Sequence, residues 1–271
     1  MVEVGSGTVS RSFFDRASRK AGREFACVVH KKPARLIAGH PLVSFTFDDF
    51  PESALTRGGA LLESMGVRGT YYASPGLAGP SRQMGNIAST ELFMECVHRG
   101  HELGCHTFNH IDCAQSSRGE LERNLHLNRE LSDRVGLKMS RQFAYPYGSF
   151  DLSSKRLIAR EFDSARTTRN GVNLGEIDLS ALYSRAMGAG RSDSFFQDLI
   201  ERHADTPGWL VFYTHDVSDQ PSHFGCSVKR LASLVEACAK RSIAIATVGE
   251  VLARHVARPD ARSSRQSEAT F

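Results

Sequence analysis

The chain has 271 residues, enough for one large domain or two small ones. Its hydrophobic fraction of 41% and charged fraction of 24% are ordinary for a globular protein with a sizeable core. The net charge of +4 comes largely from the two ends, without the interleaved aromatic residues of a nucleic-acid surface, so we expect no nucleic-acid partner.

Apolar runs alternate with amphipathic stretches along most of the chain. In chain order, strands are predicted at residues 42–48, 69–74, 101–106, 142–147, 163–168, 182–187, 209–215 and 242–248. Helices are predicted between and after them, at residues 53–65, 90–99, 116–135, 152–161, 194–203, 228–240 and 249–255. A loop rich in Gly and Pro covers residues 75–86. This repetition predicts parallel βα units and an α/β barrel of seven or eight units.

The simplest domain organisation is a single catalytic domain over residues 38–256. Residues 1–37 then form an N-terminal arm, and the polar residues 257–271 a disordered tail. The N-terminus lacks the apolar core of a secretory signal, and no segment reaches the ~18 apolar residues of a membrane span. The six cysteines form no C-x-x-C pair. We therefore expect a cytoplasmic protein with no transmembrane segment, and the sequence does not indicate its oligomeric state.

Potential catalytic groups follow several of the predicted strands. They are the pair Asp48 and Asp49, the histidines His106 and His110, the segment 145–148 (YPYG) and His215. In an α/β barrel the carboxyl ends of the strands meet at one rim, so these side chains are predicted to lie together. Taken singly, the aspartates could be a solvated turn and His215 a core histidine. Their joint occurrence at consecutive strand ends favours a site.

The residue types at this rim indicate a divalent metal. Two histidines and a carboxylate, with positions left open, can hold a catalytic ion. His106 and His110 are four residues apart, so both imidazoles can face the same way at the start of a helix. Adjacent carboxylates repel each other unless a cation or a proton neutralises one of them, and a bound cation also activates water as a nucleophile.

These motifs resemble the polysaccharide deacetylase family (carbohydrate esterase family 4). The first family motif, T-F-D-D, stands at residues 46–49, and the second, H-[ST]-x-x-H, at residues 106–110. The P-Y-G ending of the third stands at residues 146–148, and the apolar strand ending in one histidine at residues 210–215. The resemblance covers roughly residues 42–248 and implies a distorted (β/α)7 barrel that resembles a TIM barrel.

By position, the resemblance implies a role for each matching residue. Asp49, His106 and His110 would hold one divalent ion, Asp48 would be the general base and His215 the general acid. The backbone N–H of Tyr147 would help to bind the oxyanion. Zinc is the first expectation for the metal, and cobalt, nickel, iron or manganese could also serve. The implied reaction is hydrolysis of N-acetyl or other N-acyl groups on an amino-sugar-containing carbohydrate.

The sequence also departs from the family pattern. Phe50 stands where most members have Gly, the Arg of the usual R-x-P is absent before Pro146, and no D-x-x-D-[WY] motif is visible. Arg166, Arg169 and Asp216 are candidates for holding Asp48 and His215 in place. Arg166 and Arg169, with Tyr145 and Pro146, are also predicted to bind substrate.

Three other functions stay open at this point. One is a same-fold amidohydrolase acting on a non-sugar amide such as a cyclic imide or ureide, which the presence of Asp48 disfavours. Another is a non-catalytic carbohydrate-binding barrel, which the presence of both Asp48 and His215 disfavours. The third is a relative acting on formamido sugars of lipid-linked precursors.

Overall fold

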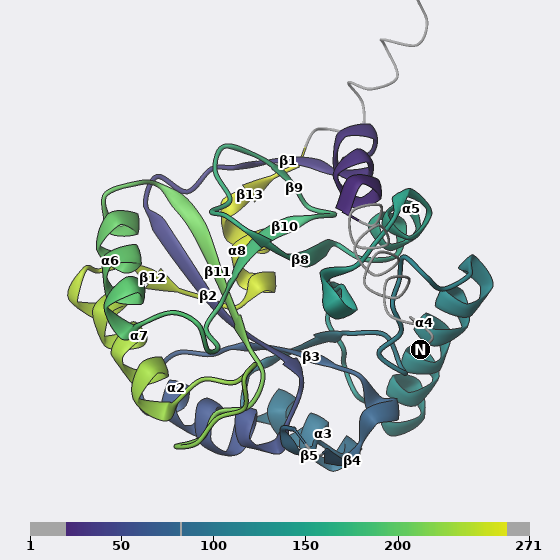
Figure 1. Ribbon diagram of the computed structural model, residues 1–271, viewed down its shortest axis with the longest axis horizontal. Coiled ribbons are helices and arrows are strands. Elements are labelled where there is room, and N and C mark those ends of the chain that lie inside the picture. The colour runs from purple at the N-terminus through teal and green to yellow at the C-terminus, as the bar shows by residue number, and fades with distance from the viewer. Residues whose placement is uncertain (1–19, 82, 259–271) are drawn as a thin grey trace, which may run out of the picture.

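Seven parallel strands close into a barrel in the computed structural model, which describes residues 20–81 and 83–258 (Figure 1). The ring closes because the last barrel strand pairs with the first as well as with its predecessor. In ring order the strands are β2 (Pro41–Asp49), β3 (Thr70–Ala73), β6 (Glu102–Cys105), β7 (Gln142–Ala144), β8 (Ser164–Asn170), β10 (Leu182–Ala186) and β11 (Gly208–Thr214). The predicted (β/α)7 barrel is confirmed.

Strand β2 is the centre of the closure. It pairs with β11 in seven-residue register, from Pro41 opposite Gly208 to Phe47 opposite Thr214. Its other edge is shared by β12 (Ala244–Ile245) near the start of β2 and by β3 near its end. Residues 42–50 are all buried, as expected for a parallel strand covered on both faces.

Helices surround the barrel on the outside (Figure 1). They are α2 (Ala60–Ser64), α3 (Thr90–His98), α4 (Arg118–Val135), α5 (Leu152–Glu161), α6 (Asp193–Ala204), α7 (Val228–Lys240) and α8 (Val248–His255). The predicted helix 53–65 is interrupted, because residues Ala54–Gly59 form a π-helical segment before α2. The predicted strand 242–248 shortens to β12 because Thr247 and Glu250 form a capping box that starts α8.

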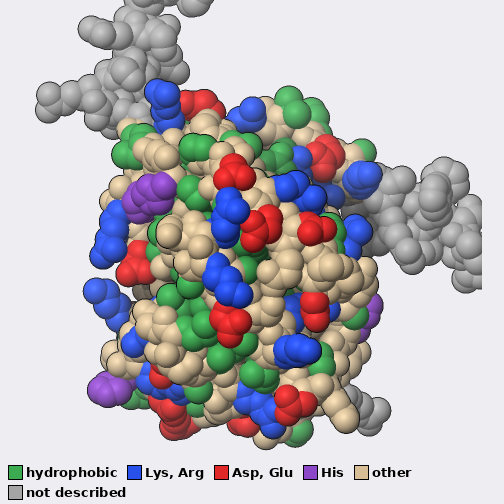
Figure 2. All heavy atoms as spheres, turned by 90° about the vertical axis from the view of Figure 1, so that its left-hand side faces the viewer, with side chains coloured by type: hydrophobic (Ala, Val, Ile, Leu, Met, Phe, Trp, Pro, Cys, Tyr) green, Lys and Arg blue, Asp and Glu red, His purple; other side chains and the backbone are tan. Residues whose placement is uncertain are grey.

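The side of the barrel formed by α6 and α7 carries mixed charges (Figure 2). Ion pairs join the two helices, with Arg230 bonded to Asp193 and Arg241 to Glu201 and Asp205. Cationic side chains on this face therefore sit among anionic ones instead of forming a basic stripe. None of the helices in residues 20–81 and 83–258 combines the length and the apolar character needed to span a bilayer.

The N-terminal arm packs against the barrel. Residues 20–29 form a helix, and β1 (Pro33–Leu36) pairs antiparallel with β9 (Glu176–Asp178) and β13 (Val256–Ala257). Strand β1 of the predicted arm and the first residue of the predicted tail, Ala257, thus belong to one small sheet. Residues 1–19 and 259–271 of these two predicted segments lie outside the described residues.

The predicted loop 75–86 carries a short hairpin near the carboxyl end of β2. Its strands are β4 (Gly79–Ser81) and β5 (Gly85–Ile87), which pair antiparallel. An isolated bridge joins Ile87 to Pro51, and the N–H of Ala88 donates to the carbonyl of Phe50 at 2.9 Å. The hairpin is therefore attached to the residues that follow the Asp48–Asp49 pair.

Candidate metal centre and catalytic groups

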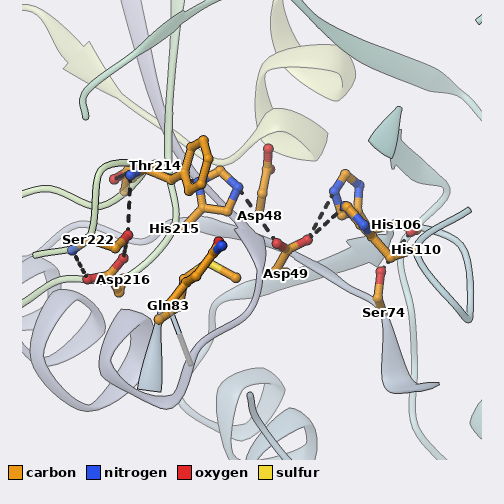
Figure 3. A network of polar contacts seen from close by, with 12 residues as sticks. Asp48, Asp49, Ser74, Gln83, His106, His110, Thr214, His215, Asp216 and Ser222 are labelled. Atoms are coloured by element: carbon orange, nitrogen blue, oxygen red, sulfur yellow. Dashed lines mark hydrogen bonds and ion pairs between the residues drawn. The ribbon is translucent and has the colours of Figure 1, made fainter. Parts of the chain in front are cut away.

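Asp49, His106 and His110 converge at the carboxyl ends of β2 and β6 (Figure 3). Asp49 Oδ1 lies 3.4 Å from His106 Nε2 and 3.1 Å from His110 Nε2. One ligand atom from each of the three residues lies within 4.8 Å of the others. The structure therefore brings together the three side chains predicted to hold a metal.

The tautomer of His106 follows from its hydrogen bond. Its Nδ1 lies 2.8 Å from the carbonyl oxygen of Ala144, which can only accept, so Nδ1 carries the proton. This leaves the lone pair on Nε2, which faces Asp49. Burial lowers the pKa of His106 to about 4, so the ring is neutral at physiological pH. A neutral imidazole held by a second hydrogen bond is the form that ligates metals.

Asp49 presents a buried carboxylate to the two histidines. Its Oδ1 is buried and has no hydrogen-bond partner among the described residues. Burial raises the pKa of the carboxyl, but the nearby imidazoles of His110 and His106 outweigh it and hold the pKa below its usual range. A buried carboxylate oxygen without a donor is costly. The donor set of one carboxylate and two imidazoles therefore fits a divalent ion.

Asp48 points away from its neighbour and pairs with Arg166. The side chains alternate along β2, so adjacent residues face different directions. Arg166, on β8, donates from a terminal guanidinium nitrogen to Asp48 Oδ1, and both side chains are almost fully buried. The guanidinium also lies over the rings of Tyr72 and Tyr213, at 5.3 and 4.9 Å from their centroids. These contacts fix Asp48 in one orientation.

His215 follows β11 and faces the same centre from the other side (Figure 3). Its Nδ1 lies 3.3 Å from the carbonyl oxygen of Phe224, so this nitrogen is the donor. Its Nε2 lies 3.8 Å from Asp49 Oδ2. Asp216, a candidate for orienting His215, instead accepts hydrogen bonds from the backbone and hydroxyl of Ser222. It fixes the loop that presents the Phe224 carbonyl.

Unusual backbone conformations gather at this centre. Six non-glycine residues in the described part of the chain have positive φ, and five belong to the site segments: Asp49, Phe50, Thr107, His110 and Tyr147. Such conformations cost about 1–3 kcal/mol each and persist only where the surrounding structure enforces them. Gly148 also has positive φ, and a Cβ there would collide with the side chain of Thr168. The sharp turns aim the side chains of three different loops at one point.

The four residues predicted to bind substrate are not placed for that role. Tyr145 and Pro146 are buried, and the Tyr145 hydroxyl donates to the carbonyl of Ser180 at 3.1 Å. Arg166 is fully buried against Asp48, so a substrate cannot reach it. Arg169 pairs with Glu24 at 2.8 Å and lines a separate cavity. We correct the prediction accordingly: the first three are internal supports, and Arg169 holds the arm.

Sequence reasoning missed several supporting groups. Ser74, at the end of β3, donates its hydroxyl to the carbonyl of His106 at 2.8 Å. The hydroxyl of Thr107 accepts from the N–H of Ile111 at 3.0 Å and stabilises the turn between the two histidines. Ser74 follows a predicted strand and could have been found by the strand-end argument. The Phe224 carbonyl is a backbone group and leaves no signal in the sequence.

A family model described as polysaccharide deacetylase matches residues 37–163, which include Asp48, Asp49, His106, His110 and the loop after β7. This range, just under half of the chain, is similar to the polysaccharide deacetylase family. The resemblance inferred from the sequence motifs and the predicted enzyme class, a deacetylase, are thereby confirmed. No curated protein sequence matches the chain.

Solved structures of this family share the fold at low sequence identity. The chitin deacetylase of the fungal pathogen Colletotrichum lindemuthianum has a TM-score of 0.58 and 19% identity, over 80% of this chain and 89% of that one. The Xyl-CE4 domain of a multidomain xylanase from the hindgut metagenome of Trinervitermes trinervoides has a TM-score of 0.55 and 18% identity, over 80% and 91%. A family 4 acetyl xylan esterase from Clostridium thermocellum, in complex with cobalt, has a TM-score of 0.52 and 18% identity, over 78% and 90%.

One departure from the family pattern has a direct structural explanation. Phe50 has φ of 58°, a conformation that glycine adopts without strain and that explains why most deacetylases of the family have Gly there. Here the phenyl ring is fully buried and packs on Tyr71 and Phe93, with centroids 4.8 and 5.3 Å away. Aromatic packing thus retains a strained turn that glycine would make freely.

Proposed function

We propose that this chain removes N-acetyl or other N-acyl groups from an amino-sugar-containing carbohydrate, with one divalent metal ion. The observation that carries the proposal is the convergence of Asp49, His106 and His110 on one point, flanked by the separately oriented Asp48 and His215. A carbohydrate-binding barrel would need no buried base and no acid beside a ligand set. The match of residues 37–163 to the polysaccharide deacetylase model supports the same function.

The metal would be held by Asp49, His106 and His110. Such an ion supplies Lewis-acid polarisation of a carbonyl and lowers the pKa of water. Zinc is the expected ion because two imidazoles and a carboxylate suit it, and cobalt, nickel, iron or manganese would fit the same donors. The cobalt in the esterase from Clostridium thermocellum is consistent with this range.

Asp48 is the proposed general base. Arg166 occupies its Oδ1, so Oδ2 is the oxygen available to take a proton from water as the acyl carbon is attacked. Asp48 does not share its hydrogen-bonding capacity with His106 or His110, since these face Asp49. A positioned base of this kind contributes roughly 10²–10⁴-fold to the rate.

His215 is the proposed general acid. Because its Nδ1–H is directed at the Phe224 carbonyl, Nε2 is the nitrogen that gives a proton to the departing amine. This nitrogen lies 3.8 Å from Asp49 Oδ2, at the edge of the proposed metal site. The backbone N–H of Tyr147, on the strained turn after β7, is the proposed donor to the developing oxyanion.

Aromatic rings border the centre on two sides and support a carbohydrate substrate. Tyr147 is 66% exposed and its ring lies 4.5 Å from that of His110. Phe224 is 49% exposed and its ring lies 5.5 Å from that of His215. Exposed aromatic faces beside polar groups can contact the C–H faces of sugar rings while the polar groups fix the orientation. N-acetylglucosamine units, the substrate implied by the name of the Colletotrichum chitin deacetylase, are the first candidates.

The test is acetate release from N-acetylglucosamine oligomers by the purified chain. It is run as isolated, after treatment with a chelator, and after restoring zinc or cobalt. Release that a chelator stops and metal restores is the expected result. A metal-loaded protein that releases acetate from no sugar, yet hydrolyses a cyclic imide or ureide, would transfer the function to that class of amide.

A further inference from the structure

A cavity of about 280 Å³ adjoins the candidate metal centre. It is lined by residues 147–150 of the loop after β7, by Asp112, and by Lys20 and Arg23 of the N-terminal helix. Tyr147 is the shared wall, because its ring also contacts His110. A group bound in the cavity would therefore lie next to a substrate at the metal centre.

Two cations of the arm face this cavity. Lys20 and Arg23 are three residues apart in a helix and so lie on one side of it. Among the described residues, Lys20 forms no ion pair, and the Nε of Arg23 is buried without a hydrogen-bond acceptor. The nearest described carboxylate to that nitrogen, Glu24, is 3.8 Å away. The guanidinium of Arg23 thus keeps hydrogen-bonding capacity that no described acceptor takes up at Nε.

The anionic wall of the cavity is already committed. Asp112 accepts hydrogen bonds from the N–H of Ala114 at 3.0 Å and from the side-chain amide of Gln115 at 2.7 Å. Its carboxylate therefore stabilises the turn after His110. The two cations outnumber this single carboxylate, so the lining has a surplus of positive charge.

The helix that carries the two cations is anchored in the protein core. Ala26, on the same helix, is fully buried. The buried ammonium of Lys155 donates to the carbonyls of Ala26 and His30 at 3.3 and 2.6 Å and pairs with Asp178 at 2.6 Å. A cation at the carboxyl end of a helix is favourable. The helix lies outside residues 37–163, the range that the family model matches.

We propose that this cavity binds an anionic group of the substrate, a carboxylate or a phosphate, next to the N-acyl group at the metal centre. The inference rests on the proposed function and narrows its substrate class to acidic N-acylated carbohydrates. Lys20 and Arg23 donate charge-assisted hydrogen bonds to the anion, and the guanidinium suits the geometry of either oxyanion.

The experiment compares three ligands on the full chain: neutral N-acetylglucosamine, its 1-phosphate, and N-acetylmuramic acid, which carries a carboxylate. Binding is measured by calorimetry and acetate release by assay, so that affinity is read even without turnover. The variant combines Lys20→Gln with Arg23→Gln. The control is Lys31→Gln, which removes an exposed cation of the same arm outside this cavity.

We expect at least one anionic ligand to bind the native chain about tenfold or more tightly than the neutral sugar, since charged hydrogen bonds are strong. In the double variant, KM for the anionic ligands should rise and their preferred binding should be lost, while kcat is unchanged. Its affinity for the neutral sugar should stay within about twofold of that of the native chain. The stronger of the two anionic ligands identifies the oxyanion. Equal binding of all three ligands, or an equal effect of the variant on all three, overturns the inference.

The two proposals fail in different ways. Acetate release without an anionic preference leaves the deacetylase function standing and removes the anion site. An anionic preference that the double variant abolishes, with no acetate released from any ligand, retains the site and removes the proposed reaction.

Discussion

Asp48 and Arg166 form a buried ion pair between the first and the fifth strands of the barrel. Arg166 is held between the rings of Tyr72 and Tyr213, so the guanidinium cannot follow Asp48 into another orientation. The family pattern places an arginine before the P-Y-G turn, and this chain has Ala144 and Tyr145 immediately before Pro146. An arginine from the next strand therefore occupies the place of a tether to the base.

Replacement of Arg166 should show whether Asp48 needs only a positive charge beside it or also the orientation that the guanidinium gives it. In Arg166→Lys the ammonium cannot stack between two rings, so kcat should fall about tenfold or more with the metal content unchanged. In Arg166→Met, kcat should fall further. The free energy of unfolding should decrease by about 3–5 kcal/mol, because Asp48 is left buried without a partner. Steady-state kinetics and denaturant unfolding measure both. Wild-type kcat in Arg166→Lys would show that Asp48 needs no such tether.

Asp48→Asn tests the base directly. The amide keeps the size of the side chain but accepts no proton, so turnover should fall by roughly 10²–10⁴-fold. Metal binding should persist, because Asp49 and not Asp48 faces the histidines. The readouts are acetate release and metal content by elemental analysis. Asp219→Asn, at an exposed carboxylate, is the matched control. Near-normal turnover in Asp48→Asn would rule out its assignment as the base.

His106→Ala tests the ligand set. Loss of one of three ligands should abolish stoichiometric metal binding at micromolar metal and remove activity with it. His126→Ala, at an exposed histidine on α4, changes the same residue type without touching the centre and should behave as the native chain. Full metal occupancy in His106→Ala would show that the ion binds elsewhere.

At Phe50, replacement by glycine should destabilise the protein less than replacement by alanine, the reverse of what is expected at an ordinary buried position. Loss of the buried ring should destabilise both Phe50→Gly and Phe50→Ala by a few kcal/mol. Glycine adopts the positive φ without strain and alanine does not, so the glycine variant should be more stable than the alanine variant by about 1 kcal/mol. Chemical denaturation measures the difference. The opposite order would mean that the turn relaxes once the ring is gone.

The ion pair between Asp178 and Lys155, which holds the helix of the arm, should weaken at acid pH. Burial raises the pKa of its carboxyl, but hydrogen bonds from Lys155 and Ser180 prevail and lower it. A carboxyl whose folded pKa is depressed stabilises the protein above the unfolded value of about 4, and this contribution disappears as the pH falls through the folded pKa. Native protein should therefore exceed Asp178→Asn in stability at pH 6, by about 3 kcal/mol, and the gap should close below pH 4.

Unfolding in urea at several pH values would follow this change. Asp219→Asn, at a largely exposed carboxylate, should differ little from the native chain at any of them. A gap between native protein and Asp178→Asn that stays constant down to pH 3 would contradict the anchor.

The sequence predicted the barrel and the convergence of Asp49, His106 and His110 because both depend on patterns that local structure preserves. Alternating strands and helices require parallel pairing, and the strand ends place Asp49 and His106 on one rim. The partner of Asp48 could not be chosen between Arg166 and Arg169, because the sequence does not show that Arg166 turns toward Asp48 whereas Arg169 pairs with Glu24. The burial of Tyr145 was missed because the strand β7 ends at Ala144, and the turn beyond it points inward.

Strands β2 and β11 pair over seven residues although they lie far apart in the sequence, and this separation affects the order in which the site can form. Asp48 and Asp49 are synthesised early, whereas His215 follows a strand that pairs with theirs only after more than half of the chain has been made. Contacts of such separation form slowly, because a long loop must close first. The proposed ligands can therefore meet before the proposed acid arrives, and hydrolysis has to wait until the first and last barrel strands join.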